Sequence, residues 1–174
     1  NTVRNSDDYG ILLDGNNTAY NTITRTAIYS NGLDGIGERN NAASNIWTEV
    51  GVNDNGGLGI DKNASNDGQN IVNAPGNFGI DSINKATGVV QGHADATIFD
   101  TTVKVELYRV SPDASGFGEG GVFVGSTTTS IGGSWTITDH SPVAARGCYT
   151  AIVIKGQDAS EFSINTCRVL LPTV

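Results

Sequence analysis

The dipeptide Gly-Ile recurs at a nearly constant interval in the first third of this 174-residue chain. The intervals are 25 and 24 residues, and the three copies are Gly10-Ile11, Gly35-Ile36 and Gly59-Ile60. A period of this length is typical of a solenoid, in which each coil buries its apolar side chains against the next. The runs between the copies are short and rich in β-branched residues, which favours strands over helices. The sequence therefore predicts a solenoid of β-strands with about three coils.

Asparagine marks the same region in a second pattern. It is followed by threonine or an apolar residue at Asn1-Thr2-Val3, Asn21-Thr22-Ile23 and Asn45-Ile46. Asparagine suits the corners of coils because it tolerates left-handed backbone and its amide can stack into hydrogen-bonded ladders. We therefore expect these three asparagines to occupy equivalent positions in successive coils. The alternative is an irregular linker, rich in Asn and Gly, without regular strands.

The composition changes abruptly about half-way along the chain. Seventeen of the 18 asparagines lie in residues 1–84, and only Asn165 lies beyond them. A domain boundary is therefore predicted near Asn73–Asn84, where the sequence also carries a turn-forming Pro-Gly-Asn. The predicted domains are residues 1–78 and residues 79–174.

The second domain alternates apolar and polar residues with a period of two, most clearly in Val103–Tyr108. Similar runs are Gly88–Ala94, Val122–Ser126, Ser134–Thr138 and the two runs that contain the cysteines. Some six or seven short strands without an intervening helix are typical of an immunoglobulin-like β-sandwich. The Cys…Trp…Cys signature of antibody domains is absent, so the prediction concerns the architecture only.

The two cysteines, Cys148 and Cys167, flank a predicted hairpin. If residues 156–159 form its turn, the numbers of paired residues add up to 315 and the cysteines face each other. That register also places on one apolar face Tyr149, Ala151, Val153, Phe162 and Ile164. We predict a disulfide that stabilises the fold by about 3 kcal/mol. A disulfide indicates an oxidising compartment outside the cytoplasm, whereas the alternative is two free thiols in a reducing cytosol.

Charge and hydropathy exclude several partners. The formal net charge is −8, and the ten basic residues are scattered, so we expect no binding to nucleic acid. Apolar runs are all too short to cross a bilayer, so we expect no membrane insertion. Methionine does not occur, even at the first position, and we expect the chain to begin after processing or to belong to a longer protein.

Four motifs occur in an order that resembles a known family. They are Gly57-Leu58-Gly59-Ile60-Asp61, Ser115-Gly116-Phe117-Gly118-Glu119-Gly120, Val124-Gly125-Ser126-Thr127-Thr128 and Ser160-Glu161-Phe162-Ser163. Together they look like the carboxy-terminal region of large secreted bacterial proteins with right-handed parallel β-helix repeats and a following immunoglobulin-like module. The resemblance implies an all-β fold, namely a short right-handed parallel β-helix followed by a sandwich, in a secreted or cell-surface protein. It implies no particular chemistry. The family often carries a cysteine shortly before the second motif, whereas residues 109–113 have none.

Catalysis is tested best against the pectin-degrading enzymes, which also use parallel β-helices. Their hydrolases combine several acidic, histidine and basic motifs on successive coils to place an acid and a base across the sugar bond. Here only the pair Asp7-Asp8 is present, and we interpret it as a solvated corner. We therefore predict no catalytic residue and no enzymatic activity.

A structural calcium site is one interpretation of the acidic turns at Asp54, Asp61 and Asp67, because Ca²⁺ prefers oxygen ligands at loops. Their spacing matches neither an EF-hand nor a Gly-Gly-x-Gly-x-Asp repeat, and the other interpretation is turn acids that keep the chain soluble. Glu119, between glycines, is interpreted as a loop residue. No other cofactor is predicted.

Asn1, Thr2 and Val3 would form the exposed edge of the first coil, where backbone donors and acceptors are open. We expect that edge to pair with another chain, giving a homo-oligomer or filament. The predicted function is a non-enzymatic extracellular structural protein. The alternative is a carbohydrate-binding or adhesion module with a polysaccharide or cell-surface partner. That alternative predicts a row of exposed aromatic residues, whereas we expect the aromatics in core or coil packing: Tyr9, Tyr20, Tyr29, Trp47 and Trp135.

Overall fold

Fifteen β-strands and no helix make up the regular structure of the described residues in a computed structural model. The structure describes residues 1–62, 78–94, 102–110, 119–130, 132–142 and 147–167. The prediction of an all-β chain is confirmed.

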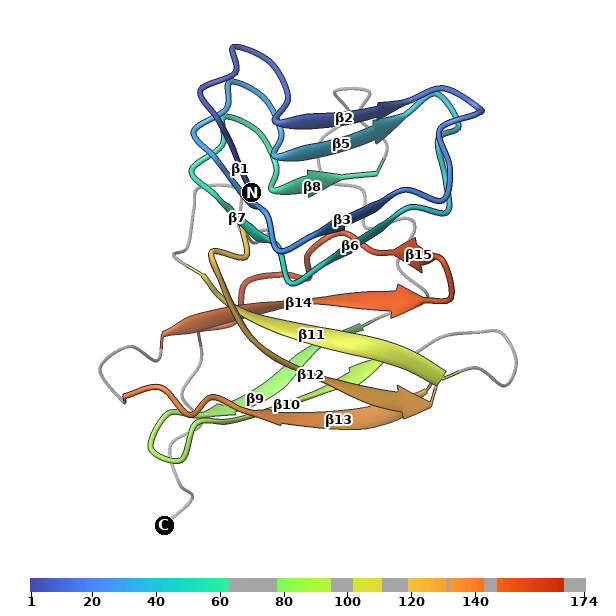
Figure 1. Ribbon diagram of the computed structural model, residues 1–174. Coiled ribbons are helices and arrows are strands. Elements are labelled where there is room, and N and C mark those ends of the chain that lie inside the picture. Colours follow the sequence, from blue (N-terminus) through green and yellow to red (C-terminus); the bar gives the residue numbers. More distant parts are fainter. Residues whose placement is uncertain (63–77, 95–101, 111–118, 131, 143–146, 168–174) are drawn as a thin grey trace.

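The first 62 residues form a stack of coils (Figure 1), which we call the coil stack. The first coil holds β1 (Thr2–Arg4), β2 (Ile11–Asp14) and β3 (Thr22–Thr24). The second holds β4 (Ala27–Tyr29), β5 (Ile36–Arg39) and β6 (Ile46–Thr48), and the third holds β7 (Gly51–Asn53) and β8 (Ile60–Asp61). Equivalent strands pair in parallel to give three sheets, β1-β4-β7, β2-β5-β8 and β3-β6. Each strand therefore finds its partner one coil away.

The strand register tests the two sequence repeats separately. Ile11 pairs with Ile36, and Ile36 with Ile60, so the Gly-Ile repeat marks equivalent positions as predicted. The Asn repeat is right only for its second and third members, because Thr22 pairs with Ile46. Asn1 is not equivalent to them, since the neighbouring Thr2 pairs with Ala27 in a different sheet. A coil with three strands has three similar corners, and a short Asn motif does not say which corner it occupies.

Asparagine amides stack inside the coils, as expected from the sequence. Asn31 donates from Nδ2 to Oδ1 of Asn55 at 2.9 Å, and Asn21 donates in the same way to Asn45 at 3.0 Å. The left-handed corners repeat too, but with varied residues. At one set of equivalent corners, the residues with positive φ angles are Asn5, Ser30 and Asp54. Neighbouring coils hold one another's corners in this conformation, because Asn5 N donates to Ser30 O and Ser30 N to Asp54 O.

The remaining strands are antiparallel, and we call residues 78–167 the antiparallel unit. One sheet has the order β13-β10-β9 and the other β12-β11-β14-β15. Their bounds are β9 (Phe78–Asn84), β10 (Val89–Ala94), β11 (Thr102–Val110), β12 (Val122–Ser130), β13 (Gly133–Thr138), β14 (Cys148–Lys155) and β15 (Asp158–Ala159). The predicted strands are present except the second cysteine run, Glu161–Cys167, which has isolated bridge positions but no continuous strand. β15 lies in residues predicted as the hairpin turn, and β9 was not expected and begins one residue before the predicted domain boundary.

Two apolar cores hold the molecule together. One lies between the antiparallel sheets and includes Val105, Leu107 and Trp135. The other is shared, because side chains of the coil stack such as Trp47 cluster with Phe162 and other residues of the antiparallel unit. The sheet β12-β11-β14-β15 thus packs against the coil stack on one face and against the second sheet on the other (Figure 1).

The predicted disulfide between Cys148 and Cys167 is present, but the hairpin register is not uniform. Near the turn, Ile154 pairs with Ala159 and Lys155 with Asp158, so the residue numbers add up to 313 instead of 315. The predicted register returns only at the bridge between Tyr149 and Thr166.

The single apolar face predicted for this hairpin is therefore wrong at two residues. Phe162 turns into the core shared with the coil stack, and Ile164 is 57% exposed. The cause is a change of hydrogen-bonding partner, because the hydroxyls of Ser160 and Ser163 accept from backbone N–H groups of β14 in place of carbonyls. Between β15 and Cys167, the pairing with β14 therefore changes from pairs that add up to 313 to the predicted sum of 315.

Candidate functional site

The antiparallel unit presents a buried glutamate to the third coil at the corner after β7. Glu119 Oε1 accepts from Asn55 N at 2.8 Å and from Asn55 Nδ2 at 3.1 Å, and Oε2 accepts from Asp54 N. The same two groups of Asn31 are bonded to Asn55 one coil earlier. Glu119 therefore continues the amide ladder where a further asparagine would stand. Its interpretation as a loop residue missed this contact.

A second buried glutamate meets the corner after β6. Glu106, in β11, accepts from Glu49 N at 2.9 Å and from the Thr48 hydroxyl at 2.5 Å. Lys104 Nζ at 2.6 Å and the Tyr108 hydroxyl at 2.5 Å also donate to it. Burial by itself would raise the pKa of Glu106, but these donors outweigh it and lower the pKa below its ordinary value. Burial and the nearby carboxylate raise the pKa of Tyr108.

Further groups of the antiparallel unit complete the contact with the second and third coils. Glu161 accepts from Lys62 N at 2.8 Å, and the Gly120 carbonyl accepts from Val52 N at 2.9 Å. The Ser160 carbonyl accepts from the indole of Trp47 at 2.8 Å. Glu106, Glu119 and Glu161 are all buried, and we call them the capping glutamates. They satisfy backbone donors that would otherwise be buried without an acceptor.

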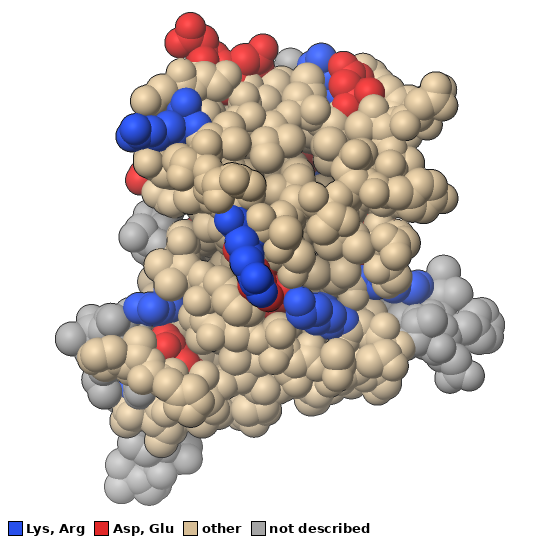
Figure 2. Space-filling model, viewed as in Figure 1, with Lys and Arg blue, Asp and Glu red and all other residues tan. Residues whose placement is uncertain are grey.

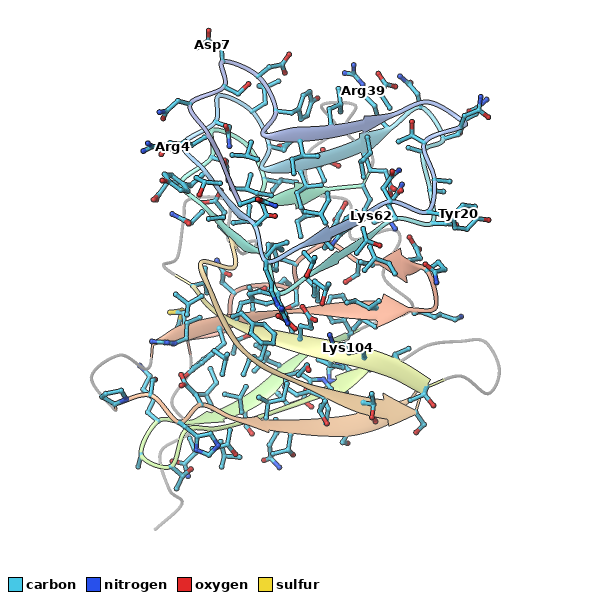
Figure 3. All side chains as sticks on the ribbon, viewed as in Figure 1. Arg4, Asp7, Tyr20, Arg39, Lys62 and Lys104 are labelled. Atoms are coloured by element: carbon cyan, nitrogen blue, oxygen red, sulfur yellow. A yellow bond between two sulfur atoms is a disulfide. The ribbon has the colours of Figure 1, made fainter. Side chains whose placement is uncertain are left out.

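Lys62, at the end of the third coil, lies in a polar cluster at this junction (Figure 3). Its Nζ is 2.5 Å from Asp158 Oδ1, 2.9 Å from the Ala159 carbonyl and 3.5 Å from Glu38 Oε2. The side chains of Lys62 and Glu38 are only 4% and 2% exposed, whereas that of Asp158 is 45% exposed. Burial raises the pKa of Glu38, against a hydrogen bond from Asn45 and the charge of Lys62.

The opposite end of the coil stack is formed by β1, β2 and β3. Each of these strands pairs with the second coil, and within the described chain none has a partner strand on its other side. The predicted edge residues are there: Asn1 and Thr2 are exposed, and Val3 is half-buried opposite Ile28. Figure 1 shows that this edge lies at the end of the stack away from the antiparallel unit.

The predicted calcium ligands are not brought together as far as the structure describes them. Asp54 is exposed, Asp61 is buried, and Asp67 lies outside the described residues. The charge of Asp61 acts instead on Asp34, whose pKa is raised chiefly by burial and also by Asp61. Within the described ranges, no group of three or more His, Cys, Asp or Glu residues is arranged so that it could hold a metal ion. A calcium site that includes Asp67 stays a prediction.

The aromatic residues are divided between core and surface. Trp47 and Trp135 are buried as expected, whereas Tyr20 is 74% exposed and points away from the coil stack (Figure 3). Tyr9 lies under Arg39 and Tyr29 under Arg4, in cation–π contacts of 5.6 and 5.9 Å. The three tyrosines precede β2, precede β3 and lie in β4, so they belong to different sides of the coils and form no single row.

The charged side chains that the figures show are dispersed. Figure 2 shows Lys and Arg scattered over the visible face, with acidic side chains among them at the end of the coil stack. Asp7, one of the adjacent acids considered for catalysis, projects outward at this end (Figure 3).

Comparisons with known proteins assign this chain to no family. No protein-family model matches the chain, and no curated protein matches it. Among the described residues, no helix has the length and apolar character needed to span a membrane. The disulfide indicates an oxidising, non-cytoplasmic location.

Proposed function

We propose that this chain is a non-enzymatic extracellular structural protein in which a short right-handed parallel β-helix ends on an immunoglobulin-like sandwich. The sheet orders β13-β10-β9 and β12-β11-β14-β15, with one sheet packed on the other, support the sandwich architecture. The stacked parallel sheets with a period of 24 or 25 residues support the β-helix.

The difference between the two ends of the coil stack carries the proposal. At one end the capping glutamates and the Gly120 carbonyl accept from backbone N–H groups of the third coil and of the corner that leads into it. At the other end, β1, β2 and β3 are edge strands within the described chain. An open row of backbone donors and acceptors pairs readily with another strand. The sandwich thus acts as a cap, and the opposite edge is the surface for assembly with a further coil.

Light scattering after size exclusion, over a series of concentrations, tests the assembly. We expect species larger than the 18.1 kDa chain at high concentration. Thr2→Lys places a charge on the exposed edge strand and should reduce association, since charged side chains blunt sheet edges. Gln91→Lys, on the exposed face of the central strand β10, is the matched control and should leave association unchanged.

A wild-type protein that stays monomeric at every concentration would contradict self-association through the edge. It would favour the carbohydrate-binding or adhesion module instead, and binding to polysaccharides would then be measured.

A further inference from the structure

The polar cluster around Lys62 joins three parts of the chain that are far apart in sequence. Lys62 follows β8, Glu38 lies in β5, and Asp158 begins β15 on the antiparallel unit. The Lys62 amine and the Asp158 carboxylate are 2.5 Å apart across a separation of 96 residues. An amine held at this distance from a carboxyl group is in position for a reaction between them.

The surroundings of this pair also differ from those of an ordinary surface ion pair. The Lys62 side chain is 4% exposed and its amine lies 5.6 Å from the ring centre of Trp47, so water reaches it poorly. Glu38, the second carboxyl group near the amine, is buried and accepts a 2.6 Å hydrogen bond from Asn45. Burial raises the pKa of Glu38, and its Oε2 lies 3.5 Å from the Lys62 amine, so this carboxyl group is placed to accept a proton from it. Asp158, on the exposed side, leaves a route for a small product to reach solvent.

We propose that Lys62 and Asp158 become joined by an intramolecular amide bond, with Glu38 as the proton carrier. The lone pair of Lys62 Nζ forms the new bond to Cγ of Asp158, and the bond from Cγ to one carboxyl oxygen breaks. Before this bond forms, Glu38 accepts one proton from the lysine ammonium, which frees the lone pair, and passes it to Asp158, so that the acceptor is a neutral carboxyl group. A second proton from the nitrogen follows the same route, and the oxygen leaves as water. An ammonium and a carboxylate thus give one amide and one water, and no oxidant, reductant or other co-reactant is required.

The position of the bond explains what it would do. It would connect the last described residue of the coil stack to the antiparallel unit, beside the contact made by Glu161 with Lys62 N. The coil stack and its cap could then not separate under load, even if the hydrogen bonds between them broke. This consequence is independent of the assembly edge, so the failure of either proposal leaves the other standing.

A second lysine in the same molecule provides a contrast. Lys104 Nζ lies 2.6 Å from Glu106 Oε1, a distance close to that of the Lys62 pair. Lys104, however, is 36% exposed, and the donors around Glu106 lower the pKa of that carboxyl group. A carboxylate held in its ionised form is a poor acceptor for an amine, so we expect no bond there.

The intact mass of the full-length folded protein, measured after reduction of the disulfide, is the first test. We expect a mass one water lower than the sequence requires. After digestion with trypsin, a peptide of residues 40–85, uncut at Lys62, should be found attached to residues 156–168. A full sequence mass with separate peptides 40–62 and 63–85 would overturn the proposal. A loss of ammonia instead of water would place the bond at an amide such as that of Asn45 and would also overturn it.

Variants separate the reaction from folding. Lys62→Arg keeps the positive charge but has no amine that can form this bond, and it should restore the full mass. Glu38→Gln keeps the hydrogen-bonding shape and should slow or abolish the water loss, while circular dichroism shows a folded protein. Lys104→Arg is the matched control and should show the same water loss as the wild type. If the Glu38→Gln protein lost water as completely as the wild type, the proposed role of Glu38 as the proton carrier would be wrong.

Discussion

The coil stack and the antiparallel unit both bury apolar side chains, but they satisfy their backbones differently. In the antiparallel unit, strands pair with other strands of the same unit, and β11 has neighbours on both sides inside the unit. In the coil stack every strand depends on the coil before it or after it. A repeat of this kind cannot end without leaving donors and acceptors unpaired. The comparison shows why a sandwich is useful at the end of such a stack: its strands pair with one another without a further coil, and its side chains can accept hydrogen bonds from the last coil.

The same difference appears in the polar groups used inside each region. Within the coil stack, asparagine amides both donate and accept, so each can bond to the coils on either side. At the junction the asparagine is replaced by glutamate, which only accepts when ionised. A carboxylate ends a ladder, whereas an amide continues it. The capping glutamates therefore fix where the stack stops.

The variants with the largest expected effect test whether the coil stack and the antiparallel unit unfold together or separately. Trp47→Ala and Trp135→Ala each remove a buried indole and should lower the free energy of unfolding by about 4 kcal/mol. Each variant leaves one tryptophan as a fluorescent reporter, in the antiparallel unit for Trp47→Ala and in the coil stack for Trp135→Ala. Because Trp47 lies in the shared core, we expect the remaining reporter to unfold at a lower urea concentration in both variants. A Trp135 signal unchanged by Trp47→Ala would mean that the two regions unfold independently.

The disulfide concerns the antiparallel unit alone. It closes a sequence separation of 19 residues, and its replacement by Cys148→Ser with Cys167→Ser should lower the free energy of unfolding by about 3 kcal/mol. Urea denaturation of the double variant measures the loss, and the wild type under reducing conditions provides the comparison. If reduction left the wild-type urea midpoint unchanged, the stabilisation of about 3 kcal/mol expected from this disulfide would be wrong.

Removing a capping glutamate tests the junction directly. Glu119→Ala leaves the N–H groups of Asp54 and Asn55 without their carboxylate acceptor, and we expect a loss of about 2 kcal/mol. Glu119→Gln keeps an acceptor oxygen and should lose less. Glu49→Gln is the control, because its side chain pairs with the highly exposed Arg25 and should contribute nothing measurable. Equal losses for Glu119→Ala and Glu49→Gln would contradict the capping role.

The smallest expected effect is a pH dependence that originates at the junction. The folded pKa of Glu106 lies below its ordinary value of 4.5, so its contribution to stability is present above that pH and is lost as the pH falls through the folded pKa. Glu38 has the opposite sign, because its raised pKa gives a contribution that is lost as the pH rises through the folded value. Glu106→Gln should therefore flatten the fall in urea midpoint below pH 4.5. A fall as steep as in the wild type would assign the acid sensitivity to other carboxylates.

Several features of the fold follow from patterns that are local or periodic. The Gly-Ile repeat predicted the correct strand register in β2, β5 and β8, because one isoleucine per coil packs in or against the core and leaves a regular pattern in the sequence. The period-two run at Val103–Tyr108 identified β11 for the same reason. The two cysteines predicted their own bond, since the residues between them suit a hairpin.

The contacts at the junction between the coil stack and the antiparallel unit correspond to no local or periodic pattern in the sequence. Glu106, Glu119 and Glu161 are single residues in three unrelated local contexts, and their shared role appears only when the third coil lies against them. The exit of Phe162 from the predicted apolar face has a similar origin, because it depends on two serine hydroxyls that replace carbonyls.

The sequence by itself thus determined most of the β-strands, the coil period and the disulfide, all of which depend on short-range spacing. Only the tertiary structure decided which buried acids end the coil stack and which amine meets Asp158. Those contacts join residues tens of positions apart, and their energy comes from burial that no local pattern records.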